Sequence, residues 1–104
     1  MADKTYNGWT NYETWVAKLW LDNEQGTHYE VTDEASQRFS DAQENETEPD
    51  TYDFADWLKS YVEDLMPELP ASLASDLLNA AMSEINWSEM AESYLGDAKE
   101  EAER

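Results

Sequence analysis

The sequence predicts an all-α fold, a compact single-domain bundle of about four to five helices with room for one short strand or irregular segment. Apolar residues recur along most of the chain at the spacing of amphipathic helices. No alternating pattern of useful length predicts a sheet, although residues 27–32 could form a short strand. A chain of 104 residues has the size of one domain. We therefore expect residues 1–104 to form a single helical domain around one hydrophobic core.

The first helix is expected to start at a capping box, in which Thr10 caps the helix and Glu13 reaches back to the cap. Its apolar stripe comprises Tyr12, Trp15, Val16, Leu19 and Trp20. Gly26 is suited to the left-handed backbone that ends many helices. The pattern therefore predicts a helix that ends near Asn23, followed by a turn that extends to His28.

A second helix is expected to start at Thr32 and to carry few apolar positions. These positions are Ala35, Phe39 and Ala42, a thin stripe that predicts a helix lying on the surface. The following residues, 44–50, include four acids and no apolar residue apart from Pro49. We expect a mobile acidic loop around residues 44–51.

Three further helices are predicted after this loop. The apolar positions of the third are Phe54, Leu58, Tyr61, Val62, Leu65 and Met66, and prolines at 67 and 70 end it. The fourth, around residues 73–85, is the most apolar stretch and is expected to lie closest to the core centre. Asn86 followed by Glu89 predicts the cap of a fifth helix, which extends into the charged end of the chain at 97–104. The expected core residues are Tyr12, Trp15, Leu19, Leu58, Val62, Leu77, Leu78 and Leu95.

Negative charge is the dominant property of the chain. Its 25 Asp and Glu against 6 Lys and Arg give a formal net charge of -19 at pH 7. Like charges repel and oppose the compact state, and an ordinary small domain carries a net charge of magnitude about 2–8. A folded protein with this surplus is expected either to use its field on a partner or to be adapted to high salt.

The composition argues against catalytic and metal chemistry. With no cysteine and one histidine, the chain has no thiol nucleophile, disulfide framework or zinc cluster of the usual ligands. His28 is interpreted as a surface residue. No segment fits a calcium-binding EF-hand loop, and the regularly spaced Asp50, Asp53 and Asp56 are interpreted as partners of a helix dipole. We expect a protein that is not an enzyme, with no catalytic residue, metal ligand or cofactor.

The sequence also indicates where the protein resides. No apolar run approaches the roughly 20 residues of a membrane span. Residues 1–4 lack the basic and apolar regions of a secretory signal. We expect a cytoplasmic protein without membrane contact.

Two concentrations of acidic side chains are the candidate partner-binding surfaces. The first, the acidic run, comprises Asp41, Glu44, Glu46, Glu48, Asp50, Asp53 and Asp56. The second, the C-terminal ridge, shares one face of the last helix and comprises Glu89, Glu92, Glu100 and Glu103. The tryptophans and tyrosines near the start of the chain are assigned to the core, because a platform that stacks nucleic-acid bases needs a basic groove.

The surplus charge is similar to that of duplex DNA of the same length. A compact chain of this size has a radius of gyration near ~13 Å and spans about 33 Å. Duplex DNA carries one charge per about 1.7 Å of axis, so about 33 Å of it holds roughly 19 charges. Carboxylates would then replace phosphates in the Lys- and Arg-lined groove of a nucleic-acid-binding protein. We expect a DNA mimic that binds such a protein and does not itself bind nucleic acid.

Two segments carry a family resemblance. Residues 6–15, YNGWTNYETW, followed by LWLDN at 19–23, resemble the opening of small acidic proteins encoded by phages and mobile elements of bacteria. Residues 77–87, LLNAAMSEINW, are similar to a second shared segment. The matching residues are of core and cap types, so the resemblance implies a shared fold and no catalytic residue. It also implies a setting in the host cell cytoplasm, where acidic DNA mimics block restriction enzymes, CRISPR effectors or other nucleic-acid-binding proteins.

A second function class stays open at this point. The chain could be a non-mimic interaction module that binds its target through an exposed aromatic or apolar patch, with acids that serve solubility or salt adaptation. The sequence also leaves open a homodimer, which would lengthen the acidic surface. Reversing the charge of one acidic surface separates the two function classes, because only a mimic loses binding.

Overall fold

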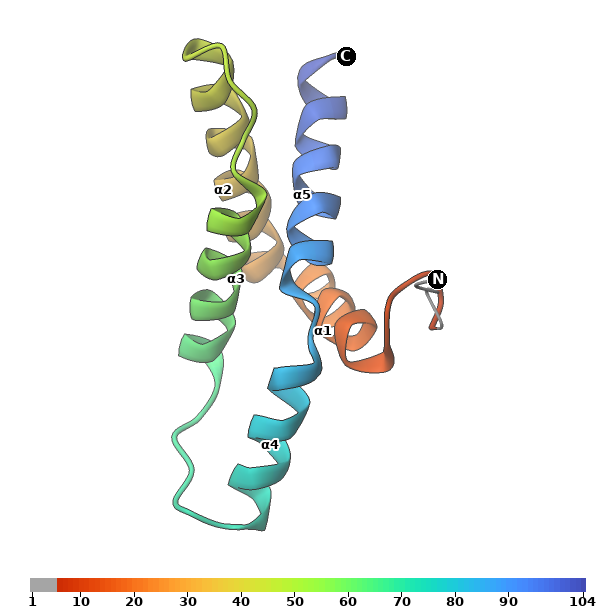
Figure 1. The fold of residues 1–104 in the computed structure, drawn as a ribbon, viewed down its shortest axis with the longest axis vertical. Coiled ribbons are helices and arrows are strands. Elements are labelled where there is room, and N and C mark those ends of the chain that lie inside the picture. The colour runs from red at the N-terminus through yellow and green to blue at the C-terminus, as the bar shows by residue number, and fades with distance from the viewer. Residues whose placement is uncertain (1–5) are drawn as a thin grey trace.

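The computed structural model describes residues 6–104 as five helices without a sheet (Figure 1). They are α1 (Tyr12–Asn23), α2 (Gln25–Glu44), α3 (Thr51–Leu65), α4 (Leu73–Glu84) and α5 (Trp87–Ala102). Within this range the β pairing consists of one isolated bridge between Tyr6 and Trp9. The all-α prediction is confirmed, and the strand considered at residues 27–32 is part of α2 instead. Residues 1–4, on which the expectation about a secretory signal rests, lie outside the described range.

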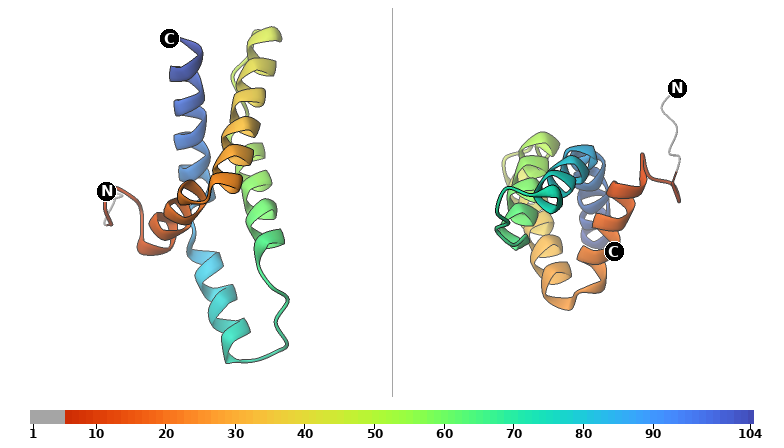
Figure 2. Two further views of the ribbon diagram at one scale, coloured as in Figure 1. Left: turned by 180° about the vertical axis from the view of Figure 1, so that it is seen from behind. Right: turned by 90° about the horizontal axis from the view of Figure 1, so that it is seen from below.

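Helix α5 is the central element of the fold. It packs against both α2 and α3, while α1 contacts α2, α4 and α5. Helices α2, α3 and α5 run alongside one another, whereas α4 and the segment before it extend beyond the end of α3 (Figures 1 and 2). The molecule therefore measures 47 × 33 × 23 Å with a radius of gyration of 14.8 Å. The expected globule about 33 Å across was wrong, because α4 does not fold back onto the bundle.

The core is formed mainly by α2, α3 and α5. Its buried residues are Leu21, Val31, Ala35, Phe54, Ala55, Leu58, Val62, Met90, Ala91, Tyr94, Leu95 and Ala98. Three of the expected core residues, in α3 and α5, are among them, and Trp15 and Leu78 are half-buried. The prediction was wrong for Tyr12, Leu19 and Leu77, which are 50%, 38% and 61% exposed.

The roles of α2 and α4 are the reverse of those expected. Helix α4 contributes no buried residue, although it is the most apolar stretch of the chain. Helix α2, expected on the surface, buries Val31, Ala35 and Ala42, because small side chains let its backbone approach α5 closely. Apolar spacing identifies an amphipathic helix but does not identify what that helix packs against.

The junction between α1 and α2 differs from the expected glycine turn. Helix α2 begins at Gln25, seven residues before the predicted start at Thr32, and Gly26 lies inside it. The carbonyls at the end of α1 are satisfied by Thr27, whose hydroxyl donates to Leu21 O at 2.8 Å and to Glu24 O at 3.1 Å. No left-handed glycine is therefore needed, since a side chain supplies the donor.

Side-chain caps set the starts of α1 and α5. Asn11, rather than Thr10, caps α1, and its Oδ1 accepts from the backbone N–H of Thr14 at 2.9 Å. The capping box predicted from Thr10 and Glu13 was therefore wrong, because Thr14 is the residue three positions after the cap. Asn86 caps α5 as expected, and its Oδ1 accepts from the backbone N–H of Glu89 at 3.1 Å. Asn is as favourable as Ser or Thr at the N-cap of a helix, so Asn11 can replace Thr10 in this role.

Candidate functional site

The acidic run wraps around one end of the molecule, where α2 passes into α3. Asp41 and Glu44 lie on the last turns of α2, and the loop of residues 45–50 follows, as expected. Asp53 and Asp56 lie on the first turns of α3. All seven carboxylates are on exposed residues. The sequence therefore placed this surface correctly, because a loop without apolar residues has nothing to bury.

One member of the acidic run is neutralised by a basic partner. Arg38 donates from Nη1 to Asp53 Oδ2 at 2.6 Å and from Nε to Glu34 Oε2 at 2.8 Å. The guanidinium also lies 5.2 Å from the centroid of the Phe54 ring. Among residues 6–104, the other six acids of the run form no ion pair. Most of the run's charge therefore remains available to a partner.

The C-terminal ridge is shorter than expected. Glu92, Glu100 and Glu103 are exposed, and Glu100 lines a depression between α5 and α2. Glu89 is only 8% exposed, and its Oε1 accepts from the backbone N–H of Thr10 at 3.1 Å. The assignment of Glu89 to a partner-binding surface was wrong, because the chain preceding α1 covers the first turn of α5. Its position three residues after the Asn86 cap was the signal for a structural role.

The acidic run and the C-terminal ridge meet. Glu48 of the loop and Glu92 of α5 line the same shallow surface depression, together with Lys99. Figure 1 shows that the end of α2 and the end of α5 lie at the same end of the molecule. The two surfaces that the sequence separates by about 30 residues thus adjoin at Glu48 and Glu92, and we call the acidic run together with Glu92, Glu100 and Glu103 the acidic end.

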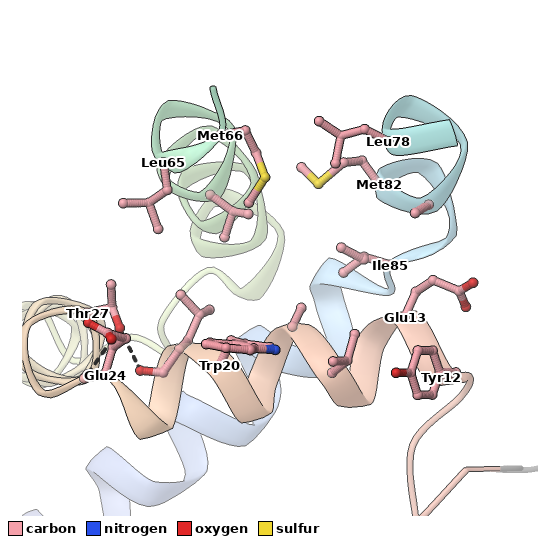
Figure 3. A pocket seen from close by; sticks show the side chains of 15 residues that line it. Tyr12, Glu13, Trp20, Glu24, Thr27, Leu65, Met66, Leu78, Met82 and Ile85 are labelled. Carbon is pink, nitrogen blue, oxygen red and sulfur yellow. Dashed lines mark hydrogen bonds between the residues drawn. The ribbon is translucent and has the colours of Figure 1, made fainter. Parts of the chain in front are cut away.

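An apolar groove lies away from the acidic end, between α1, the last turn of α3 and α4. Its volume is about 390 Å³. Figure 3 shows Leu65 and Met66 on one side, Leu78 and Met82 on the other, and α1 with Trp20 along the base. The sequence did not reveal this groove, because each of these residues fits a core position of its own helix.

A polar network joins α1 to α5 beneath the surface. The phenol of Tyr94 donates to Asp22 Oδ1 at 2.7 Å, and Lys18 Nζ donates to Asp22 Oδ2 at 2.6 Å. The same ammonium lies 4.4 Å from the centroid of the Tyr94 ring. Burial and the hydrogen bond to Asp22 raise the pKa of Tyr94 above its usual value. We assign this network to stability, since its groups satisfy one another.

A second tyrosine offers a direct test of the packing between α2 and α3. Partial burial and the hydrogen bond that Tyr61 donates to Glu30 raise the pKa of Tyr61 from 10.0 to about 12. The raised pKa means that the folded state prefers the neutral phenol. The stability that this preference contributes is complete below pH 10 and is lost as the pH rises towards 12.

Tyr61→Phe is therefore expected to remove a phenol that ionises near pH 12 rather than near pH 10. The measurement is the tyrosinate absorbance of the wild type minus that of the variant, followed through an alkaline titration. Tyr52→Phe, on the same helix but 75% exposed, provides the comparison. A difference curve for Tyr61 with its midpoint near pH 10 would contradict the hydrogen bond to Glu30.

The acidic side chains of residues 6–104 do not gather into a metal site. No group of three or more His, Asp or Glu side chains is arranged to hold a metal ion. Asp50 instead caps α3 by accepting from the backbone N–H of Asp53 at 3.1 Å, in line with the helix-dipole interpretation. None of the described helices is long and apolar enough to cross a membrane.

Comparison with known families matches residues 2–101 to a family of unknown function, DUF7249. The chain belongs to the DUF7249 family. The matched range contains the acidic run, the apolar groove and all of the C-terminal ridge except Glu103. No curated protein and no solved structure matches the chain. Membership of DUF7249 therefore relates this chain to other proteins without giving a function, and the evidence for a function lies in the surfaces of the chain.

Proposed function

We propose that this DUF7249 protein is a DNA mimic that inhibits a host defence protein, either a CRISPR effector or a restriction enzyme. Its acidic end would enter the nucleic-acid-binding channel of that protein and exclude the substrate by competition. The observation that carries the proposal is that the acidic run adjoins the C-terminal ridge on α5. Complementary charge would also speed the encounter with a basic channel, and no catalytic residue or cofactor is needed.

The overall charge density supports this proposal. A net charge of -19 over the 47 Å length of the molecule is about one charge per 2.5 Å. Duplex DNA carries one per about 1.7 Å. The protein therefore has a somewhat lower density than DNA, and the acidic run adds a local cluster of seven acids within 16 residues. A basic channel that neutralises phosphates can neutralise these carboxylates by the same release of counterions.

The biological setting is part of the proposal. The resemblance of residues 6–15 and 77–87 to proteins of phages and mobile elements favours an inhibitor that acts in the cytoplasm of a bacterial host. In that setting the partner is a nucleic-acid-binding protein of the host, and nucleic acid competes with the inhibitor.

The decisive experiment neutralises the acidic end and compares it with the opposite end. The test variant carries Glu44→Gln, Glu46→Gln, Glu48→Gln and Asp50→Asn, the last of which keeps a side-chain cap for α3. The matched control carries Glu63→Gln, Asp64→Asn, Glu68→Gln and Asp76→Asn, four exposed acids away from the acidic end. Both variants lose the same charge.

Each protein is used to capture partners from bacterial lysate at low and at high salt, with mass spectrometry of the captured proteins. We expect the wild type and the control to retain a nuclease or CRISPR complex that duplex DNA displaces, and the test variant to retain at least about tenfold less. A partner that is indifferent to salt and to DNA, or that both variants lose equally, would refute mimicry.

The apolar groove favours a second candidate, a non-mimic interaction module. In that case the target inserts apolar side chains next to Trp20, which is 66% exposed, and the acids keep the protein soluble. Trp20→Ala would then abolish capture of the foreign partner, whereas the neutralised acidic end would have little effect. The same lysate experiment thus separates the two candidates.

A further inference from the structure

Helix α4 is poorly covered in the single chain. It has 12 residues, none of them buried, and its main packing partner is α1. Leu73 and Leu77, one helical turn apart, are 75% and 61% exposed. A helix of this length is only marginally stable in water unless its apolar face is packed. The outer ridge of Leu73 and Leu77, which we call the α4 ridge, therefore lacks the cover that its sequence requires.

The apolar groove lies immediately beside the α4 ridge. Its walls are the end of α3 and the inner face of α4, and the side chains of Met66 and Met82 face each other across the opening (Figure 3). Methionine side chains are flexible and adapt to an inserted apolar group. Each chain thus carries both a projecting apolar ridge and an apolar depression on the same end.

We propose that a second copy of this chain covers this end, forming a two-fold dimer in which the α4 ridge of each copy lies in the apolar groove of the other. A two-fold interface uses the same surface on both copies and requires that surface to be self-complementary. The adjacent ridge and groove meet this requirement, and the reciprocal insertion buries Leu73, Leu77 and Trp20 at once.

The area of this face fits a small, concentration-dependent dimer interface. A 12-residue helix is about 18 Å long, and a helix with its side chains is about 10 Å wide. Helices α1 and α4, each of 12 residues, therefore present roughly 360 Å² in projection, and the last turn of α3 adds about 50 Å². The interdigitated side chains raise the accessible area above this value, into the range of small, reversible interfaces that bury less than about 1,200 Å² in total.

The distribution of charge favours a second copy over a foreign basic partner. Residues 65–83 contain only two charged side chains, Glu68 and Asp76, in a chain that has 25 acids, and two further acids, Glu13 and Glu24, line the groove from the side of α1. The acidic end lies at the other end of a molecule 47 Å long, several times the Debye length of about 8 Å at physiological salt. Two copies that meet through α4 therefore keep their acidic ends far apart, and a basic partner is attracted to the acidic ends instead.

The test is the mass of the full chain in solution, measured by light scattering or sedimentation equilibrium over a range of concentrations. We expect the wild type to associate to twice its monomer mass of 12.0 kDa. Leu77→Glu should reduce association by at least about tenfold, because it places charge at the centre of an apolar interface. Tyr52→Glu adds the same charge at another strongly exposed site and should associate like the wild type.

Salt dependence distinguishes this dimer from the proposed inhibition. Dimerisation between two acidic chains should strengthen with salt, whereas capture of a basic partner should weaken. Neither result depends on the other. A wild type that stays monomeric at every concentration, or a Leu77→Glu variant that dimerises normally with an unchanged circular dichroism spectrum, would overturn the proposal. A monomer that binds a fluorescent apolar dye in the groove would assign the groove to a foreign apolar ligand instead.

Discussion

Replacing Phe54 with alanine is expected to lower the free energy of unfolding by about 3–5 kcal/mol. The Phe54 side chain is fully buried where α3 packs on α5, and its ring lies 5.8 Å from that of Trp57. Removing the ring leaves a cavity at the largest helix contact of the fold and also removes the surface on which the Arg38 guanidinium rests. Urea denaturation followed by circular dichroism measures the change.

Tyr52→Ala provides the matched control, because it removes an aromatic ring from the same helix where the ring is 75% exposed. Its effect should stay within about 0.5 kcal/mol. Comparable losses in the two variants would mean that α3 does not pack through Phe54. The arrangement of α2, α3 and α5 as a bundle would then be wrong as well.

The sequence predicted the existence of every helix but only part of their packing. Helices α3, α4 and α5 begin and end close to their expected residues, since prolines at 67 and 70 and the Asn86 cap are local signals. The length of α2 was underestimated, because Gly26 and Thr27 usually mark a turn and here lie within the helix. Which apolar faces become the core depends on contacts between distant segments, and local periodicity carries no information about them.

In the candidate site, too, features set by local sequence were predicted, and features set by contacts between distant segments were not. The acidic run was placed correctly, because its loop at 44–50 has no apolar residue apart from Pro49 and its helical members lie on exposed faces of α2 and α3. Glu89 was misassigned, because the segment that covers it lies about 80 residues away in the sequence. The apolar groove exists only because α4 projects beyond α3, and no pattern within α4 could reveal that. Contacts between segments far apart in the sequence therefore explain both the misassignment of Glu89 and the failure to predict the groove.

The segment that starts α1 and the junction between α4 and α5 meet in the structure. Thr14, which is fully buried, donates from Oγ1 to Asn11 Oδ1 at 2.6 Å, and the same hydroxyl accepts from the backbone N–H of Asn86 at 2.8 Å. Asn11 in turn donates from Nδ2 to Glu84 O at 2.6 Å. The cap of α1 and the cap of α5 are thus joined through one hydroxyl. This explains why Asn11, Thr14 and Asn86 are polar although Thr14 is fully buried.

Thr14→Val is therefore expected to destabilise the protein by about 1–3 kcal/mol, although valine has the shape of threonine. The substitution leaves the backbone N–H of Asn86 without its acceptor and removes a donor from Asn11, so that both helix starts are weakened together. Thr32→Val is the control, because the Thr32 hydroxyl only donates to carbonyls of its own helix, and its loss should cost about 0.5 kcal/mol or less. Urea denaturation of both variants gives the comparison. Equal effects would mean that the two caps are independent, and that the link between the start of the chain and the α4–α5 junction does not hold the fold together.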